Sequence, residues 1–380
     1  MTNPFEQQVK IGILGGGQLG RMMLQSSIDF DLDIACMDPN PEAPCHQLAS
    51  SFVKGNFQEY QQVVNFGRDK DILTIEIEHV NTDALKYLVS QGVQVYPSPD
   101  MLELIQDKGA QKQFYQDKGI PASDFVLLDN AAQAKEYASF LPAVQKTRRA
   151  GYDGQGVQVI DTEQDLGKAF DVPSVLEKKV DFSTELSVIV ARTPSGTSIT
   201  FPPVEMDFNS TANLVEFLYS PAQIDNNTAQ KAASIATDVA EKMQIVGLLA
   251  VEMFLTKDGD ILVNEVAPRP HNTGHHTIEG NITSQFEQHL RAILDLPLGD
   301  TSIVQPAVMV NLLGAVGHEG PAKYDGIDKI LAMKGAHVHL YGKKKTRPFR
   351  KMGHVTVVAS DLATAKDNAK YIQDTVKVIS

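Results

Sequence analysis

The sequence has little cysteine and no long apolar run. Its two cysteines, Cys36 and Cys45, are too few to staple a domain of this size or to build a zinc site alone. No stretch of about 18 apolar residues occurs, so we expect no segment that spans a membrane. The first ten residues are polar and lead straight into a strand-like run, which is not the pattern of a secretory signal peptide. These features predict a protein of the reducing cytoplasm.

Positive charge is also scarce. The chain has 34 Lys and Arg against 47 Asp and Glu, a net charge of −13. Such an acidic body argues against a general binder of nucleic-acid polymers, because their phosphates need a basic surface. The few basic groups therefore draw attention where they gather, at residues 146–149 and 343–351.

What the chain does contain is ordinary for a folded protein: 380 residues, 42% hydrophobic and 21% charged. At about 150 residues per domain, this length predicts two or three domains. The first hundred residues alternate strand-like runs (9–14, 34–37, 71–77, 93–96) with an amphipathic stretch at 19–30. This alternation predicts parallel βαβ units. Pro-Ser-Pro at 97–99 places a boundary near residue 100, with Asp100 expected to cap a helix that runs toward residue 106.

The pattern of apolar runs and turn residues changes after residue 120. Short strands are expected at 125–128, 143–146, 157–160, 175–177 and 186–191, separated by glycine-rich or polar turns, which favours antiparallel pairing. Helices are expected at 228–243 and 284–294, with a hairpin formed by 248–255 and 260–266. Pro297 and Gly299 mark a further break, and the last eighty residues look mostly β. The fold class expected is mixed, α/β and α+β.

A glycine-rich loop follows the first strand. Residues 15–20 read G-G-G-Q-L-G, which contains the G-x-G-x-x-G pattern between a strand and a helix, and Asp38 ends the next strand. This is the pattern of a dinucleotide-binding fold, where glycines let backbone N–H groups approach an anion and the acid binds ribose hydroxyls. Two other interpretations stay open: a tight turn that only packs, and a site for a different phosphorylated ligand.

The hairpin carries two carboxylates. Asp258-Gly259 predicts a two-residue turn, which pairs Lys257 with Asp260 and Glu252 with Glu265. The two glutamate Cβ atoms would then lie about 5 Å apart on strands that are otherwise apolar. Two carboxylates that face each other repel, and a bound cation would remove this repulsion. Mg²⁺ commonly joins one or two carboxylates to substrate phosphates. The alternatives are a solvated outer face of an edge hairpin and a bulge that breaks the pairing.

A polar loop follows the hairpin at residues 267–276. It is too polar and too rich in proline to be core, although it joins apolar elements, and such loops commonly carry substrate contacts. Arg269 can bind a phosphate or carboxylate through two parallel hydrogen bonds of its guanidinium group. His271, His275 and His276 are candidate proton carriers or ligands.

A second glycine-rich loop follows Lys146, which closes an apolar strand. Residues 147–156 hold three glycines and two arginines between two strands, which resembles a flap over phosphates. No Walker sequence occurs, so a P-loop site is disfavoured. An ordinary flexible turn is the alternative, but it does not explain Lys146.

Together these pieces resemble the ATP-grasp superfamily and, within it, the 5-(carboxyamino)imidazole ribonucleotide synthase family, also called the phosphoribosylaminoimidazole carboxylase ATPase subunit. The shared motifs are I-L-G-G-G-Q-L-G-R-M-M at 13–23, D-P-N-P-E-A-P at 38–44, K-T-R-R-A-G-Y-D-G-Q-G at 146–156, V-N-E-V-A-P-R-P-H-N-T-G-H at 263–275, Y-G-K at 341–343 and R-P-F-R-K-M-G-H at 347–354. The resemblance implies an N-terminal Rossmann-like preATP-grasp domain at 1–100. It further implies an ATP-grasp domain at 101–298, with a flap subdomain at about 120–185, and a small β-rich C-terminal domain at 299–380.

The resemblance also implies roles for individual residues. ATP would contact Lys108, Lys146, Gly151, Tyr152, Asp153, Gly154, Gln155, Gly156, Val157, Glu177, Lys178, Lys179, Val180, Glu185, Phe208, Asn264 and Glu265. The ribonucleotide would contact Gly17, Gln18, Leu19, Glu76, Tyr152, Asp153, Arg269, Lys343, Arg347 and Arg350. Glu252 and Glu265 would hold Mg²⁺, and the catalytic set would be Asp153, Arg269, His271 and His275. Phe208 stands where family members usually have histidine, and Lys108 stands where arginine is also common.

The implied reaction uses ATP and bicarbonate to carboxylate the amine of 5-aminoimidazole ribonucleotide through carboxyphosphate, in purine biosynthesis. The resemblance further implies a homodimer. Asp153 or a histidine of the 271–276 loop could accept the amine proton, and spacing does not choose between them.

Three rival functions remain at this point. The first is a formate-using transformylase of the same superfamily that acts on glycinamide ribonucleotide; His275 and His354 favour the carboxyamino enzyme. The second is an NAD-dependent oxidoreductase, suggested by the glycine loop and Asp38. The third is a nucleotide sensor without catalysis.

Overall fold

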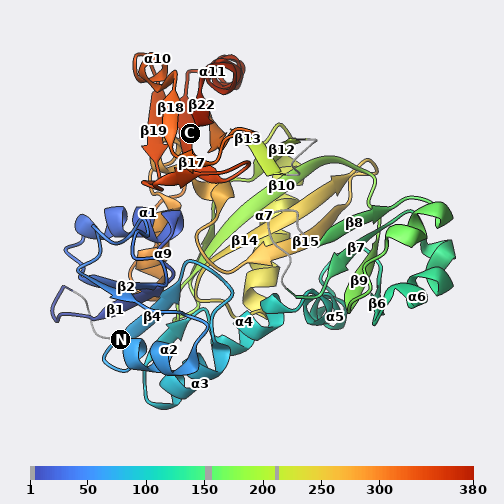
Figure 1. The fold of residues 1–380 in the computed structure, drawn as a ribbon, viewed down its shortest axis with the longest axis horizontal. Coiled ribbons are helices and arrows are strands. Elements are labelled where there is room, and N and C mark those ends of the chain that lie inside the picture. The colour runs from blue at the N-terminus through green and yellow to red at the C-terminus, as the bar shows by residue number, and fades with distance from the viewer. Residues whose placement is uncertain (1–4, 150–155, 210–213) are drawn as a thin grey trace.

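The structure, a computed structural model, describes residues 5–149, 156–209 and 214–380. Figure 1 shows a parallel sheet at the N-terminal end, a large twisted sheet through the centre, a small sheet to one side and a C-terminal unit above. Among the described residues, no helix combines the length and apolar character needed to cross a bilayer. The mixed α/β architecture agrees with the fold class expected from the sequence.

The N-terminal sheet has five parallel strands in the order β3-β2-β1-β4-β5. Its elements are β1 (Ile11–Leu14), α1 (Gln18–Ile28), β2 (Ile34–Asp38), β3 (Ser51–Lys54), α2 (Tyr60–Gly67), β4 (Ile72–Ile75), α3 (Thr82–Ser90) and β5 (Gln94–Tyr96). The parallel βαβ prediction is confirmed. The sequence analysis missed β3, since this edge strand is largely exposed and has no apolar run to reveal it.

Two helices connect this sheet to the rest of the chain, α4 (Pro99–Gln106) and α5 (Lys108–Lys118). Ser98 occupies the N-cap of α4 and Pro99 its first position, so the prediction that Asp100 caps this helix is wrong. Proline is favoured at the first helical position because its missing N–H needs no partner there. Asp107 caps α5 by accepting hydrogen bonds from the backbone N–H groups of Gly109 and Ala110.

The small sheet is antiparallel with the order β6-β9-β7-β8. It contains β6 (Phe125–Leu128), β7 (Ala143–Thr147), β8 (Val157–Ile160) and β9 (Ser174–Lys178), flanked by α6 (Ala131–Ala134) and the short helices η1 (Lys135–Phe140) and η2 (Glu163–Lys168). All four strands were expected from the sequence. The loop between β7 and β8 includes residues 150–155, which lie outside the described part of the chain.

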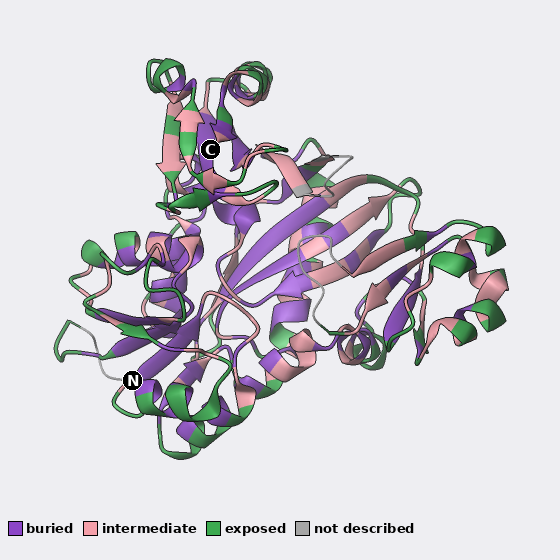
Figure 2. Cartoon of the chain, in the orientation of Figure 1, coloured by how far each residue is buried: buried purple, intermediate pink, exposed green. Residues whose placement is uncertain are grey.

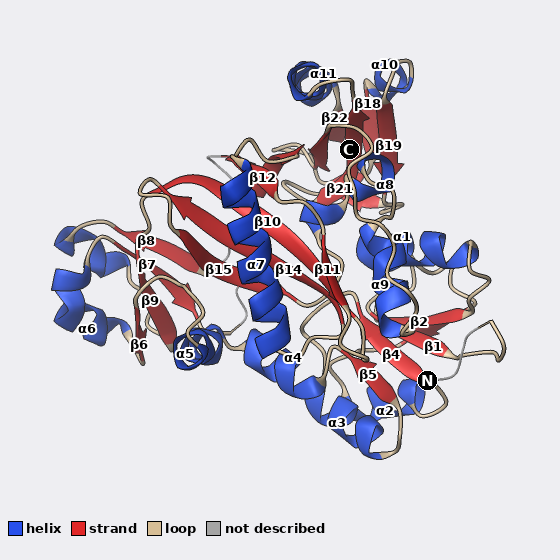
Figure 3. Ribbon diagram, turned by 180° about the vertical axis from the view of Figure 1, so that it is seen from behind, coloured by secondary structure: helices blue, strands red, loops and turns tan. Residues whose placement is uncertain are grey.

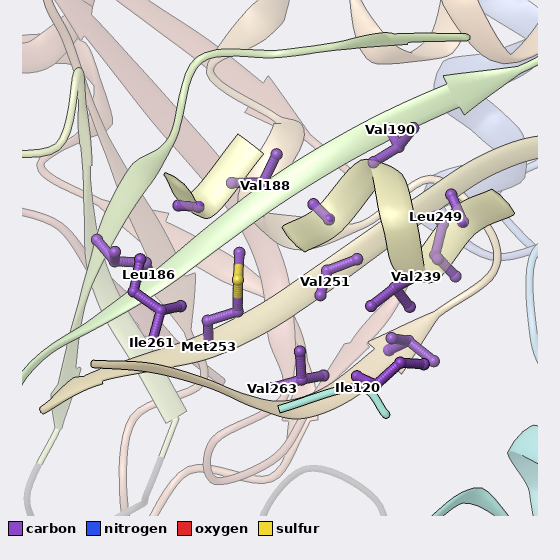
Figure 4. Packing of buried hydrophobic residues seen from close by; sticks show 14 of the residues in the cluster. Ile120, Leu186, Val188, Val190, Val239, Leu249, Val251, Met253, Ile261 and Val263 are labelled. Carbon is purple, nitrogen blue, oxygen red and sulfur yellow. The ribbon is translucent and has the colours of Figure 1, made fainter. Parts of the chain in front are cut away.

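The large sheet runs in the order β15-β14-β10-β12-β13-β16-β21-β19, and β11 pairs with β10. Its first part contains β10 (Phe182–Arg192), β11 (Ser198–Thr200), β12 (Val204–Asn209), β13 (Leu214–Ser220), β14 (Gly247–Thr256) and β15 (Ile261–Ala267). Helix α7 (Asn226–Lys242) covers one face of these strands (Figure 3). The core between them packs side chains such as Leu186, Val188, Val239 and Val251 (Figure 4).

The β14–β15 hairpin pairs Glu252 with Glu265, as predicted, but by a different route. Its turn holds three residues rather than two, because the N–H of Thr256 donates to the carbonyl of Asp260. The predicted pairing of Lys257 with Asp260 is therefore wrong. Gly259 takes φ +87°, the left-handed conformation that closes three-residue hairpins. A β-bulge at Asn264 then restores the register at the two glutamates, because Met253 already pairs with Val263.

The C-terminal region extends the large sheet and also forms two separate two-stranded sheets. Its elements are α8 (Thr277–Gly280), α9 (Gln285–Ile293), β16 (Ala307–Leu313), β17 (Gly320–Pro321), β18 (Lys323–Asp325), α10 (Ile327–Leu331), β19 (Ala336–Leu340), β20 (Lys345–Thr346), β21 (Lys351–Val358), α11 (Leu362–Thr375) and β22 (Lys377–Ile379). Strands β16, β21 and β19 join the sheet through pairing of β16 with β13.

Buried residues concentrate in the strands of both larger sheets (Figure 2). One hydrophobic cluster crosses the three regions of the chain. It joins Ile13 of β1 and Met23 of α1 to Phe286 and Leu290 of α9 and to Tyr341 after β19. The N-terminal sheet is thereby packed onto both later parts of the molecule.

Candidate active site

A cavity of about 1330 Å³ opens between the small sheet, the β14–β15 hairpin and the N-terminal glycine loop. It brings together residues that are more than 250 positions apart in the sequence, such as Gln18 and His271. Sites of this size commonly bind nucleotide-sized ligands and form where separate sheets meet. The cavity is therefore the candidate active site.

Most of the residues singled out in the sequence line this cavity. They are Gln18, Leu19, Glu76, Lys108, Lys146, Val157, Glu177, Lys178, Lys179, Val180, Glu185, Phe208, Glu252, Asn264, Glu265, Arg269, His271 and His275. Five others are not in the lining: Gly17, Gly156, Lys343, Arg347 and Arg350. Gly151, Tyr152, Asp153, Gly154 and Gln155 lie outside the described residues.

The hairpin acids face each other at the inner wall. Loss of solvation and the charge of Glu265 raise the pKa of Glu252. The charge of Lys108 lowers the pKa of Glu265, with Lys108 Nζ 2.9 Å from Glu265 Oε2. A divalent cation between the two carboxylates would lower the pKa of Glu252, because it stabilises the ionised form. Two carboxylates at this spacing fit Mg²⁺, which takes its remaining oxygens from phosphates and water.

No group of three or more histidine, cysteine or acidic side chains suited to a metal ion occurs within the described ranges. The hairpin pair therefore fits an ion that is shared with a ligand, in contrast to a structural metal enclosed by protein. The donor set consists of carboxylate oxygens, which suits a hard cation and not zinc.

Two further lysines form ion pairs with Glu177, a buried acid on β9. Lys146 Nζ donates to Asn264 Oδ1 at 2.8 Å and lies 3.1 Å from Glu177 Oε1. Lys112 Nζ lies 2.8 Å from the other oxygen of Glu177. Burial alone would raise the pKa of Glu177, but the charges of Lys146 and Lys112 outweigh it and lower the value to about 2. The sequence analysis missed Lys112; its spacing of four residues from Lys108 on one helix was the available signal.

The end of the cavity beside the small sheet is apolar. Val144, Val157 and Val159 line the cavity together with Phe182 and Phe254, whose rings stack at 4.8 Å between centroids. A flat heterocycle fits such a surface because aromatic and branched side chains bury its faces. The sequence analysis missed both phenylalanines, since an aromatic residue on a strand gives no local sign that it faces a cavity.

Glu185 stands beside this apolar end on β10. Burial raises its pKa to about 7, and the charge of Lys146 opposes the shift only in part. The carboxyl is therefore able to accept or donate hydrogen bonds near neutral pH.

Backbone N–H groups of the glycine loop donate hydrogen bonds to two carboxylates, those of Asp38 and Glu76. Gly17 N–H donates to Glu76 Oε1 at 2.9 Å, Gly20 N–H to Glu76 Oε2 at 3.3 Å and Gly16 N–H to Asp38 Oδ2 at 2.7 Å. A dinucleotide would need these donors for its pyrophosphate. The NAD-binding interpretation is therefore not favoured, because two carboxylates of the protein already accept from these donors. Burial raises the pKa of Glu76, while the Gly17 and Gly20 N–H groups partly compensate.

The polar loop after the hairpin is held in place by several contacts. Arg269 forms an ion pair with Glu78 at 2.7 Å. His271 Nδ1 lies 3.0 Å from Thr273 Oγ1, and its Nε2 lies 3.7 Å from Glu252 Oε1. Gln285 accepts from His271 N–H and donates to His271 carbonyl oxygen, so one amide group clamps this peptide. The loop therefore presents Arg269 and His271 to the cavity in fixed positions.

A histidine cluster backs this loop. The rings of His275, His354 and His339 follow one another at centroid distances of 4.8 and 4.4 Å, and Tyr341 OH lies 3.0 Å from His354 Nδ1. Burial holds the pKa values of His275 and His354 well below the ordinary value. Both rings are accordingly neutral at physiological pH.

Two basic side chains of the loop at 343–351 donate to backbone carbonyls of the same loop. Lys343 Nζ donates to the carbonyl of Lys351, and Arg350 Nη1 donates to the carbonyl of Lys345. Lys351 lines the cavity although the sequence analysis did not select it. Its position directly after Arg350 in the basic loop was the available signal in the sequence.

Comparison with known proteins covers nearly the whole chain. Three family models match in succession: the ribonucleotide synthetase preATP-grasp domain at residues 8–106, the ATP-grasp domain at 113–286 and the phosphoribosylaminoimidazole carboxylase C-terminal domain at 307–368. The N5-carboxyaminoimidazole ribonucleotide synthase of Bacillus subtilis is 39% identical over 91% of this chain and 90% of its own length. The chloroplastic phosphoribosylaminoimidazole carboxylase of Vigna aconitifolia is also 39% identical, and the chain spans 66% of its length.

Solved structures agree with these matches. The N5-carboxyaminoimidazole ribonucleotide synthetase of Thermotoga maritima superposes with a TM-score of 0.90 and 42% identity, covering 98% of this chain and 99% of its own. The Aspergillus clavatus synthase, solved with ADP and 5-aminoimidazole ribonucleotide, gives a TM-score of 0.88 at 32% identity, with 97% and 98% covered. On sequence, fold and domain order, this chain belongs to the N5-carboxyaminoimidazole ribonucleotide synthase family, ATP-dependent ligases of purine biosynthesis that carry the ATP-grasp fold.

Proposed function

We propose that this chain carboxylates the exocyclic amine of 5-aminoimidazole ribonucleotide with ATP and bicarbonate and releases ADP and phosphate. The observation that carries the proposal is the pair Glu252 and Glu265, which face each other between Lys108 and Lys146 in the cavity. Facing acids beside cationic side chains suit a magnesium-bound triphosphate. The family membership supplies the substrate class.

In this proposal ATP enters between the small sheet and the hairpin. Its adenine lies against the apolar end, framed by the backbone of residues 177–180 and by Phe208, with Glu185 at the ribose. Lys108 and Lys146 contact its phosphates, together with the 151–157 segment that precedes and begins β8. Glu252 and Glu265 hold Mg²⁺, which supplies charge neutralisation for the phosphoryl group when it is bound.

The ribonucleotide occupies the other side of the cavity. Gln18, Leu19 and Glu76 are placed for its ribose end, and Arg269 for a developing anion. Lys343, Arg347 and Arg350 are proposed for its 5′-phosphate, with Lys351 as the basic side chain of that loop that lines the cavity. These four groups supply the only strongly basic stretch besides residues 146–149.

The reaction divides into two transfers. An oxygen of bicarbonate attacks the γ-phosphorus of ATP, the bond to the bridging oxygen breaks and ADP leaves. The amine nitrogen then attacks either the carbonyl carbon of carboxyphosphate or the carbon of CO₂ that carboxyphosphate has released. Phosphate departs with the bonding electrons, and the amine loses a proton. Arg269 and His271 hold the carboxyl oxygens in place, and Asp153 or a histidine of the 271–276 loop accepts the proton. Burial lowers the pKa of His275, which makes it a weak base.

A cytoplasmic location and a homodimeric assembly complete the proposal. Both come from the family resemblance and the composition of the sequence. The homodimer is checked by light scattering of the purified chain.

The decisive experiment measures ADP release with 5-aminoimidazole ribonucleotide plus bicarbonate and, in parallel, with glycinamide ribonucleotide plus formate. We expect turnover only with the first pair. Turnover only with the second pair would replace this assignment by the transformylase.

A further inference from the structure

A lysine side chain is enclosed behind the nucleotide side of the cavity. Lys112 lies one turn after Lys108 on α5, and its side chain is only 3% exposed. It does not line the cavity, whereas Glu177 and Lys146 do. Lysine is rarely buried unless a partner compensates its charge, because removing an ammonium from water is costly. The buried ammonium group of Lys112 therefore needs a negatively charged neighbour.

The neighbouring group is Glu177, whose two oxygens bind different lysines. Lys112 Nζ lies 2.8 Å from Oε2, and Lys146 Nζ lies 3.1 Å from Oε1. Ser123 Oγ also donates to Oε2 at 3.0 Å. The three charged residues come from three different elements, α5, β9 and β7, and form a line from the interior to the cavity wall. We call this line the lysine–glutamate–lysine chain: Lys112, Glu177 and Lys146.

The order of charges along this chain has a consequence for Lys146. With Lys112 in place, Glu177 shares its negative charge between two cations. Without Lys112, the whole charge of Glu177 would act on Lys146 at short range in a weakly solvated setting. Lys146 would then be held more strongly by the protein and would be less available to an incoming phosphate.

We propose that Lys112 is a positioning residue for nucleotide binding, which acts through Glu177 to keep Lys146 oriented and available. The inference rests on the proposed contact between Lys146 and the ATP phosphates. It adds a residue that touches neither substrate nor metal.

The geometry of helix α5 directs Lys108 and Lys112 to two different acids. Residues four apart project from the same side of a helix. Lys108 reaches Glu265 on the large sheet, and Lys112 reaches Glu177 on the small sheet. The helix therefore presents one lysine to each wall of the nucleotide cleft, and its cap at Asp107 is fixed by Arg148 at 2.8 Å.

The test compares Lys112→Met with Lys118→Met, an exposed lysine at the end of the same helix. The dissociation constant of ADP is measured by calorimetry, and kcat and KM are measured for both substrates. For Lys112→Met we expect ADP affinity to fall about tenfold, kcat to fall, and KM for the aminoimidazole ribonucleotide to change less than about twofold. Lys118→Met should match the parent chain, and Lys112→Arg should recover part of the affinity.

A double-mutant cycle with Glu177→Gln separates positioning from general packing. If Lys112 acts through Glu177, the double variant binds ADP no more weakly than Glu177→Gln alone. The double variant also removes both buried charges together, so it keeps the test available if Lys112→Met does not fold.

Two results would overturn the proposal. One is a fall in melting temperature of Lys112→Met with unchanged ADP affinity. The other is independent, multiplicative losses in the cycle. Because ADP binding is measured apart from turnover, failure of the proposed carboxylation would leave this test intact.

Discussion

Two pairs of acids, one at the glycine loop and one at the hairpin, are treated in opposite ways, and each contributes at least one carboxylate to the cavity lining. At the glycine loop, Asp38 and Glu76 accept hydrogen bonds from backbone N–H groups of Gly16, Gly17 and Gly20. At the hairpin, Glu252 and Glu265 face each other, and Lys108 compensates only one of the two charges.

The difference shows what each pair is for. The backbone N–H groups of the loop already donate to Asp38 and Glu76, so this pair fixes the conformation of the loop. At the hairpin the two carboxylates face each other directly, and burial together with the charge of Glu265 raises the pKa of Glu252. Carboxylates therefore accept backbone hydrogen bonds in one region and face each other in the other, where we propose that they bind a cation.

The largest expected effect tests the hairpin. For Glu265→Gln we expect Mg²⁺-dependent ADP release to fall more than about hundredfold while the fold is kept, because one oxygen ligand loses its charge. ADP release and circular dichroism check the two parts. Asp260→Asn, an exposed acid near the tip of the same hairpin, is the matched control. Near-normal turnover of Glu265→Gln would remove this residue from the metal site.

A second prediction concerns the surroundings of the hairpin. Burial raises the pKa of Glu185 from 4.5 to about 7, so the folded state keeps a proton that the unfolded state has released. The stabilising contribution of this proton is complete below about pH 4.5 and is lost as the pH rises through about 7.

We therefore expect the free energy of unfolding of the parent chain to drop by on the order of 2 kcal/mol more than that of Glu185→Gln between pH 5 and 8, allowing for partial exposure. Urea unfolding at several pH values measures this difference. Identical pH profiles for both chains would show that Glu185 titrates normally.

The smallest expected effect tests the loop. A Cβ atom on Gly17 would lie 2.6 Å from Glu76 Oε1 and 2.8 Å from its Oε2, so Gly17→Ala must displace this carboxylate. We expect KM for the aminoimidazole ribonucleotide to rise about tenfold with unchanged ADP affinity. Gly167→Ala, where a Cβ meets open space, is the control. An equal loss of ADP affinity would mean that the two pairs of acids are not independent.

The sequence predicted the strands of the small sheet and the pairing of the hairpin acids, because apolar periodicity and turn residues are local signals. The acids were paired correctly although the turn was misjudged: the turn has one residue more than expected, and the bulge at Asn264 compensates for it. Bulges leave no reliable mark in a single sequence. The correct pairing therefore results from two features that were not predicted, the longer turn and the bulge, whose effects on the register cancel.

Other features depended on contacts that no local pattern reveals. The glycine loop fits a dinucleotide motif by sequence, but Glu76, which occupies its donors, is 56 residues beyond Gly20. Lys112 looks like any surface lysine of a helix until β9 brings Glu177 against it. Phe182 and Phe254 stack only because β10 and β14 pair side by side.

The hydrophobic cluster shared by β1, α1, α9 and Tyr341 has a consequence for folding. The three regions are distinct in topology, yet they share one core, so they should melt in a single cooperative transition. A chain cut near residue 100 would expose Phe286 and Leu290 to water and would lose the buried contact between Thr74 and His289. The cavity between the regions is consequently formed by one folding unit, in which disruption of any region loosens the walls contributed by the others.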